Sequence, residues 1–170
     1  MGYNITIGNA VLNYTNGDEY MKISCASETN EAAPDHCPYT GKGNTRSPSY
    51  TGWHDFCREA GITELFYGQG WSREDRRYKE CTEDFHRETP LLSEHPGAFP
   101  LLLGDLEFIT DARVRREQTN GGRPAGFWDE DENYREVDNG NDHVLARLLW
   151  LEFWIKWALE NCERPAISNS

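Results

Sequence analysis

The sequence lacks an excess of basic residues. Its 170 residues include 17 Lys and Arg against 29 Asp and Glu, which gives a formal net charge of −12 at pH 7. Proteins held on nucleic acid by a general basic surface need clustered Lys and Arg, so we expect no direct nucleic-acid binding. The composition also excludes the integral membrane, collagen-like and mucin-like classes.

A cysteine framework is also missing. The number of cysteines is odd, no two form a Cys-x-x-Cys pair, and their spacings are wide: Cys25, Cys37, Cys57, Cys81 and Cys162. Reduced thiols are therefore expected. Residues 1–5 carry neither the basic start nor the apolar run of a secretory signal. Together these features predict a cytoplasmic protein.

The recognised catalytic and cofactor motifs are absent as well. Residues 41–45 (GKGNT) lack the leading glycine, and the Ser or Thr after the lysine, that a Walker phosphate loop needs. The acidic run that starts at residue 129 lacks the sixth-position glycine and twelfth-position glutamate of an EF-hand. No Gly-x-Ser-x-Gly nucleophile motif occurs. We therefore predict no catalytic residue and no cofactor.

Histidine and cysteine residues leave one catalytic alternative open. His54 and Cys57 are three residues apart on a predicted helix, so their side chains share a face, and His36 precedes Cys37 directly. Thiolate and imidazole groups are the usual zinc ligands. Because the spacings match no recognised zinc pattern, we predict no bound metal, with a metal-dependent hydrolase as a further alternative.

What the sequence does contain begins with a β-hairpin signal. Residues 3–14 place two isoleucines on one face, and residues 20–25 alternate apolar and polar side chains. Between them lies Asn16-Gly17, the strongest short turn signal for a hairpin. The first part of the chain is therefore predicted to form two antiparallel strands.

Capping residues and apolar periodicity predict four helices after the hairpin. Their expected bounds are Ser49 or Thr51 to Gly61, a start at Ser72, a start near Asp105 with a basic end at Arg113, Arg115 and Arg116, and Asn141 or Asp142 to about Cys162. The last helix is apolar nearly all round, so we expect it to be central to the fold. A homo-oligomer formed through residues 142–162 is a second expectation from the same pattern.

Two polar segments, residues 28–49 and 119–142, are predicted to be long loops. No internal repeat is visible, so we expect a single domain over residues 1–170. The predicted fold class is α+β. An N-terminal antiparallel hairpin or small sheet would pack on about four helices, around the central C-terminal helix.

Residues 44–57 (NTRSPSYTGWHDFC) carry the best candidate binding site. They place an arginine, hydroxyl groups and aromatic rings around a helix N-terminus, where backbone N–H groups and the dipole favour an anion. Aromatic faces beside an arginine suit the ring and phosphates of a nucleotide. Alternatively, the aromatic residues only anchor this helix to the core. The predicted ligand-binding residues are Arg46, Ser49, Tyr50, Thr51, Trp53 and His54.

Two segments of the chain resemble an uncharacterised family of small bacteriophage and bacterial proteins. They are residues 48–57 (PSYTGWHDFC) and residues 146–166, which include ARLLWLEFW and NCERPA, with His95-Pro96-Gly97 and Pro100-Leu101 between them. The resemblance covers most of the chain after Pro48. It brings no activity or catalytic residue to transfer. It implies only a host-cytoplasm setting, in which counter-defence roles are worth considering.

The first functional hypothesis is a non-catalytic binding protein for a small anionic, nucleotide-like ligand. Its specific form would be a phage-encoded sponge that sequesters an immune signal. Tyr50 and Trp53 would stack on the ligand, Arg46 would bind phosphate, and Ser49 and Thr51 would donate hydrogen bonds. The alternative is an acidic inhibitor that presents residues 129–138 to a basic host protein as a nucleic-acid mimic.

Overall fold

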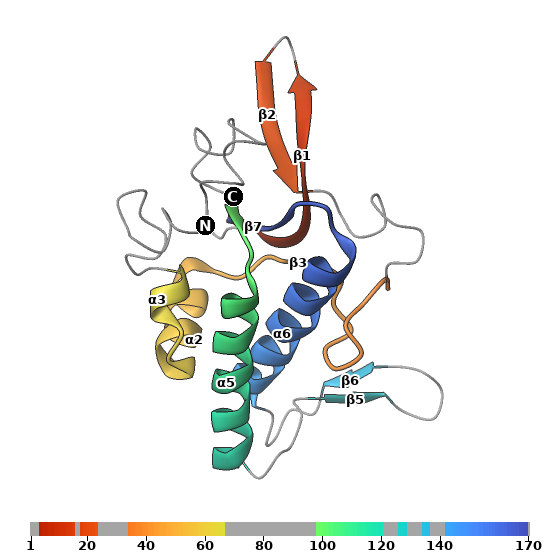
Figure 1. Ribbon diagram of the computed structural model, residues 1–170. Coiled ribbons are helices and arrows are strands. Elements are labelled where there is room, and N and C mark those ends of the chain that lie inside the picture. Colours follow the sequence, from red (N-terminus) through yellow and green to blue (C-terminus); the bar gives the residue numbers. More distant parts are fainter. Residues whose placement is uncertain are drawn as a thin grey trace.

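The computed structural model describes residues 4–15, 18–23, 34–66, 98–120, 126–128, 134–136 and 142–169 (Figure 1). Within them the fold is α+β, as the sequence predicts, with an antiparallel sheet packed against helices. No helix among these residues combines the length and the apolar character needed to cross a membrane.

The main sheet of the described chain has five strands. In chain order they are β1 (Ile5–Thr15), β2 (Asp18–Ile23), β3 (Thr45–Arg46), β4 (Ala98–Pro100) and β7 (Pro165–Asn169). The strand order is β2-β1-β7-β4, with β3 also paired to β1, and every pair is antiparallel. The first and last strands are neighbours, so the sheet joins the two ends of the described chain.

Strand β1 changes partner along its length. Residues 10–15 pair with β2, whereas residues 5–9 pair with β7. The β2 pairing confirms the predicted hairpin, whose turn at residues 16–17 lies outside the described residues. The half paired with β7 carries Ile5 and Ile7, which are fully buried in the core. In Figure 1 the half paired with β2 extends away from the helices.

The first predicted helix is confirmed as α2 (Tyr50–Ala60). Ser49 is its N-cap, and Ser49 Oγ accepts a hydrogen bond from the Gly52 N–H at 3.0 Å. At the other end Gly61 has φ of 70°, a left-handed conformation that glycine adopts without a Cβ clash. A single further turn, α3 (Thr63–Phe66), follows it.

The last predicted helix is confirmed as α6 (His143–Asn161). Asp142 is its N-cap, and its carboxylate accepts the N–H groups of Val144 and Leu145, both at 3.1 Å. The helix contacts α5, α2, β1 and β7. Most of the apolar side chains that suggested an oligomer are thus buried within this chain. The homo-oligomer through residues 142–162 stays a prediction.

The third predicted helix is confirmed as α5 (Leu103–Asn120), which runs beside α6 (Figure 1), but its end is not the predicted one. It begins before Asp105, and it continues past Arg113 and Arg116, so the prediction of a basic helix end is wrong. Two of these arginines instead form ion pairs with carboxylates on α5 itself and on other parts of the chain. The ion pairs are Arg113 with Glu117 and Glu152, and Arg116 with Glu59 and Asp142.

The structure describes residues 34–49 of the predicted loop at residues 28–49, and they do not form the polar, unburied loop that was predicted. Cys37, Thr40 and Asn44 are buried there, although the polar composition suggested that little would be. The Asn44 carbonyl oxygen accepts the Ile7 N–H at 3.0 Å, and the Asn44 side-chain amide donates to the Ile7 carbonyl oxygen at 2.8 Å. Hydrogen bonds to β1 therefore fix this segment where apolar burial alone would not.

The predicted loop at residues 119–142 is also corrected in part. Its first two residues belong to α5, and β5 (Gly126–Trp128) pairs with β6 (Tyr134–Glu136) in a separate antiparallel ladder. These strands are too short to give an alternating apolar pattern in the sequence. The second predicted helix, from Ser72, lies outside the described residues.

Candidate functional site

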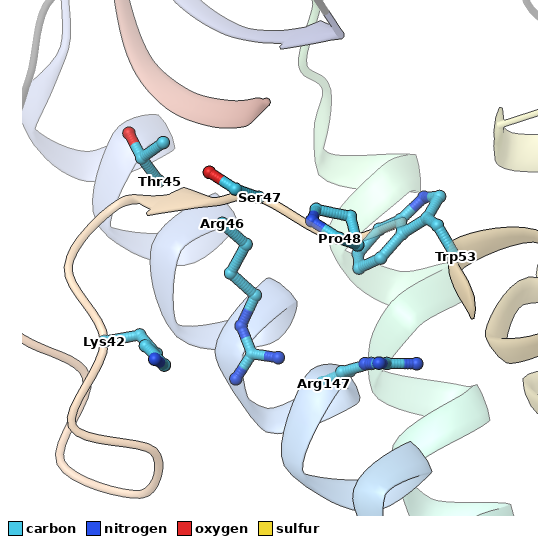
Figure 2. Close-up of a pocket in the computed structure, with 7 residues that line it drawn as sticks. All are labelled: Lys42, Thr45, Arg46, Ser47, Pro48, Trp53 and Arg147. Carbon is cyan, nitrogen blue, oxygen red and sulfur yellow. The ribbon is translucent and has the colours of Figure 1, made fainter. Parts of the chain in front are cut away.

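A cavity of about 360 Å³ lies where the segment before α2 crosses α6. Small-molecule sites usually measure roughly 300–1,000 Å³, so this cavity has the size for a small ligand. Figure 2 shows its lining side chains, which come from the loop before β3, from β3 and the residues after it, and from α2 and α6. They are Lys42, Thr45, Arg46, Ser47, Pro48, Trp53 and Arg147.

Residues 43–47, which form one wall of the cavity, are held in place by backbone pairing and by side-chain hydrogen bonds. Arg46 pairs with Ile5 in the β1–β3 ladder. The indole N–H of Trp150, on α6, donates a hydrogen bond of 2.7 Å to the Gly43 carbonyl oxygen. Ser47 Oγ donates to Asn4 Oδ1 at 2.6 Å. Contacts to the sheet and to α6 therefore set the shape of the cavity.

Arg46 lies with its guanidinium over an aromatic ring. Its Cζ atom is 5.3 Å from the centroid of the Trp150 ring, within the range of a cation–π contact. A guanidinium stacked in this way keeps its N–H groups in the plane of the fork, where they can bind an oxyanion with two hydrogen bonds. Figure 2 shows the group directed into the space between Lys42 and Arg147.

Arg147 is held on α6 by a similar arrangement. Its Cζ atom is 5.4 Å from the centroid of the Phe56 ring, and one guanidinium N–H donates to the Gly52 carbonyl oxygen at 3.1 Å. Burial lowers the pKa of Arg147, because the surrounding protein removes water from the charged group. Among the described residues no carboxylate forms an ion pair with Arg147.

The charge of the cavity is opposite to that of the chain. Three cationic side chains, Lys42, Arg46 and Arg147, line it, and none of the described lining residues is acidic. The whole sequence carries 29 acidic and 17 basic residues. The described lining of the cavity is therefore positively charged, in contrast to the chain as a whole.

The chain matches no protein-family model, no curated protein and no solved structure. The role of the cavity is therefore inferred from its own side chains. The resemblance of residues 48–57 and 146–166 to small phage and bacterial proteins stays a prediction.

Two of the six predicted ligand-binding residues line the cavity. Arg46 lies there with its charged group, and Trp53 forms part of the wall. The Trp53 ring is fully buried and packs on Phe56, with 4.7 Å between the ring centroids. It therefore also serves as the core anchor that the alternative interpretation expected.

The other four predicted residues do not line the cavity. Ser49 uses its hydroxyl to cap α2. Tyr50 is 50% exposed, and Thr51 and His54 also face solvent. The helix N-terminus attracted this prediction, but one of its N–H groups is already bonded to Ser49. The cavity lies beside the helix start instead, toward the β3 segment and α6.

Sequence reasoning missed five lining residues: Lys42, Thr45, Ser47, Pro48 and Arg147. Two features of the sequence could have indicated three of these residues, Lys42, Thr45 and Arg147. The GKGNT segment was set aside because it lacks a Walker pattern, yet it supplies Lys42 and Thr45. Arg147 interrupts an otherwise apolar stretch of the last helix, which is an unusual place for a charge unless it has a use.

The described residues provide no set of metal ligands for the metal-dependent hydrolase alternative. No three His, Cys, Asp or Glu side chains lie together there in a way that could hold an ion. Burial raises the pKa of Cys57 to about 12, so its thiol stays protonated at neutral pH, whereas zinc needs a thiolate. His54, its predicted neighbour, is exposed.

The acidic-inhibitor alternative rests on residues 129–138. Of these, only residues 134–136 are described, as strand β6, and the acidic run 129–132 lies outside the described residues. Binding to a basic host protein through this run therefore stays a prediction.

Proposed function

We propose that this protein binds a small anionic, nucleotide-like ligand in the cavity between the β3 segment, α2 and α6, without catalysing a reaction. One observation carries the proposal: three cations line the cavity, and no acidic residue stands among the described lining side chains. Arg46, Arg147 and Lys42 would bind the negative charge. This is the first hypothesis from the sequence, moved from the helix N-terminus to the cavity beside it.

The energetics of burial support an anionic ligand. A cation removed from water costs free energy unless an opposite charge or hydrogen bonds compensate for it. Arg147 is half-buried, and its partners in the described chain are a neutral carbonyl oxygen and an aromatic ring. A bound oxyanion would supply the compensation that these partners give only in part.

The remaining lining residues fit the neutral part of such a ligand. The hydroxyl groups of Thr45 and Ser47 can each offer or accept a hydrogen bond. Pro48 and Trp53 form an apolar wall near Arg147 in Figure 2. A ring or sugar against this wall, with phosphate toward the cations, is the arrangement that the side chains favour.

In this proposal the protein retains its ligand and does not convert it. A phage-encoded sponge that sequesters a nucleotide-derived immune signal is the biological form we favour. It agrees with the resemblance of residues 48–57 and 146–166 to small phage and bacterial proteins.

Native mass spectrometry of the purified protein, followed by a denatured spectrum, tests the proposal. We expect the wild type to release a small molecule of nucleotide-like mass, and Arg147→Met to lose it. Methionine retains most of the aliphatic packing of arginine and removes the charge. Lys156→Met on the exposed face of the same helix is the matched control, and it should retain the ligand.

Two results would contradict the proposal. One is a wild-type protein that carries no small molecule and takes up none from a nucleotide extract. The other is equal retention by Arg147→Met and the wild type. A bound zinc mass would favour the metal-dependent hydrolase instead. The intact spectrum also gives the oligomeric state.

A further inference from the structure

Trp150 of α6 contacts the wall of the cavity, although it is not one of the lining residues. Its side chain is fully buried. The indole N–H donates a hydrogen bond of 2.7 Å to the Gly43 carbonyl oxygen, and the centroid of the ring lies 5.3 Å from Arg46 Cζ. A single side chain of α6 therefore holds residues 42–46, which supply three of the lining side chains, at two points.

The turn that leads into this segment rests on the same part of α6. The Cys37 N–H donates to the Lys42 carbonyl oxygen at 2.6 Å, and the Gly41 N–H donates to the Cys37 carbonyl oxygen at 2.9 Å. The Cys37 side chain is fully buried, with its Sγ atom 4.0 Å from the Leu149 carbonyl oxygen. Leu149 and Trp150 are adjacent in the sequence, so the place of Lys42 also depends on how this segment rests on α6.

Trp150 also relates the two arginines of the cavity to each other. It follows Arg147 by three residues on α6, so the two side chains share one face of the helix. Arg147 is fixed by the Phe56 ring and by the Gly52 carbonyl oxygen. Arg46 comes from β3 and reaches the same face of α6 over the Trp150 ring. The position of Arg46 relative to Arg147 therefore depends on Trp150.

Resting on the proposed function, we propose that Trp150 is a positioning residue for anion binding in the cavity. It acts through residues 42–46, because it holds the Gly43 carbonyl oxygen and stacks against the Arg46 guanidinium. A site whose groups are held in place before the ligand arrives loses less affinity to the ordering of side chains and loops. Loss of the Trp150 contacts therefore weakens anion binding in a protein that is still folded.

Trp154 provides a matched control on the same helix. It is fully buried, and its ring contacts are with Phe153 and Trp157. Its indole N–H has no hydrogen-bond partner in the described part of the chain, and the side chain does not line the cavity. Trp154→Phe removes the same atoms from the core as Trp150→Phe, but none of the contacts to residues 42–46. Comparison of the two variants separates positioning from core packing.

Calorimetric titration with AMP and with inorganic pyrophosphate tests the proposal, at a temperature where circular dichroism shows each variant to be folded. We expect Trp150→Phe to bind about tenfold more weakly than the wild type, because phenylalanine stacks less strongly on a guanidinium and has no N–H for Gly43. Trp154→Phe should bind as the wild type does. Arg147→Met should lose binding, as the proposed function requires.

A second measurement uses the wild type and does not depend on the folding of Trp150→Phe. In NMR spectra the indole N–H signal of Trp150 should shift when pyrophosphate saturates the protein, because Arg46 stacks on this ring. Hydrogen exchange of the same N–H should slow, since the bound anion holds residues 42–46 against α6. The Trp154 signal should not move. An unchanged Trp150 signal at saturation would overturn the proposal.

The outcomes distinguish this inference from the proposed function. Equal affinities of the wild type and Trp150→Phe, with binding lost in Arg147→Met, would make the positioning role wrong and leave the anion site standing. An equal loss of affinity in Trp150→Phe and Trp154→Phe would also overturn it, since core packing would then be the cause. If neither AMP nor pyrophosphate binds the wild type, both the inference and the proposed function are wrong.

Discussion

Along α5 each half-buried arginine meets two carboxylates, whereas at the cavity Arg147 meets an aromatic ring and a carbonyl oxygen. Hydrogen bonds to Glu152 and Asp142 raise the pKa of Arg113 and Arg116, respectively. Burial lowers the pKa of Arg147. Arg113 and Arg116 therefore form ion pairs between the helices, whereas Arg147 forms none with a described carboxylate at the cavity. The difference teaches that carboxylates neutralise the arginines of the first region, whereas the second region is the one for which we propose a ligand.

The largest expected effect comes from breaking the balanced region at Asp142. Asp142→Ala removes both the N-cap of α6 and the carboxylate that pairs with Arg116 at 2.6 Å. We expect the free energy of unfolding to fall by about 3 kcal/mol, since a cap contributes about 1 kcal/mol and a half-buried ion pair contributes more. Urea denaturation measures it. Asp142→Asn keeps a capping oxygen and should recover part of the loss. Equal losses in the two variants would assign the effect to the charge.

The second prediction compares the unfolding free energies of Arg116→Met and Arg147→Met. The first leaves the Asp142 carboxylate, which is buried, without its cation, and should cost about 2 kcal/mol. The second removes a desolvated charge and should leave the unfolding free energy of the ligand-free protein unchanged within about 0.5 kcal/mol. Urea denaturation of both variants, after removal of any bound ligand, measures the two unfolding free energies. If Arg147→Met is the less stable of the two, Arg147 is a structural residue.

A third prediction concerns the buried thiol of Cys57, which lies near Arg147. The pKa of Cys57 is raised to about 12 by burial, against a lowering effect of nearby Arg147. An unfolded thiol releases its proton near pH 9, whereas the folded one retains it, so stability declines as the pH rises above about 9. Between pH 9 and 10 this thiol should account for a loss of about 1 kcal/mol. Cys57→Ala should show a shallower decline in denaturation experiments at these two pH values.

A second thiol, that of the half-buried Cys162, provides the control for the Cys57 experiment. Burial raises the pKa of Cys162 to about 11, so Cys162→Ala should flatten the same decline. The double variant should flatten it further. A decline that is unchanged in all three variants would mean that other groups, and not these thiols, control the alkaline stability.

The last prediction concerns Ser49, where the cap of α2 and the cavity can be told apart. Ser49→Ala removes the hydrogen bond to the Gly52 N–H and should cost about 1 kcal/mol of stability. Its affinity for AMP or pyrophosphate should equal that of the wild type, because Ser49 does not line the cavity. Thermal denaturation and calorimetric titration give the two values. A large loss of affinity would return the site to the helix N-terminus.

Much of the local structure could be predicted because its causes are local. Ser49 and Gly61 cap α2, and Asp142 caps α6, through hydrogen bonds and backbone angles within a few residues. Asn16-Gly17 marked the hairpin for the same reason. The prediction of a basic end for α5 failed because Arg113 and Arg116 pair with carboxylates on other parts of the chain, which local reasoning does not place.

The candidate site was predictable only in part. Arg46 and Trp53 lie in a segment whose composition already suggested an anion and a ring. Arg147 lies about a hundred residues further along the chain, and it reaches the cavity only because α6 packs beneath the β3 segment through Trp150. No spacing in the sequence relates these two arginines.

The sequence alone determined the α+β class, the bounds of α2 and α6, and a helix whose apolar surface had to be buried. These follow from periodicity, capping and the hydrophobic effect, which act over short stretches of chain. The tertiary structure decided which arginines form ion pairs along α5 and which line the cavity. Electrostatic interactions and cavities depend on distances in space, so only the packing of β3 against α6 could bring Lys42, Arg46 and Arg147 together.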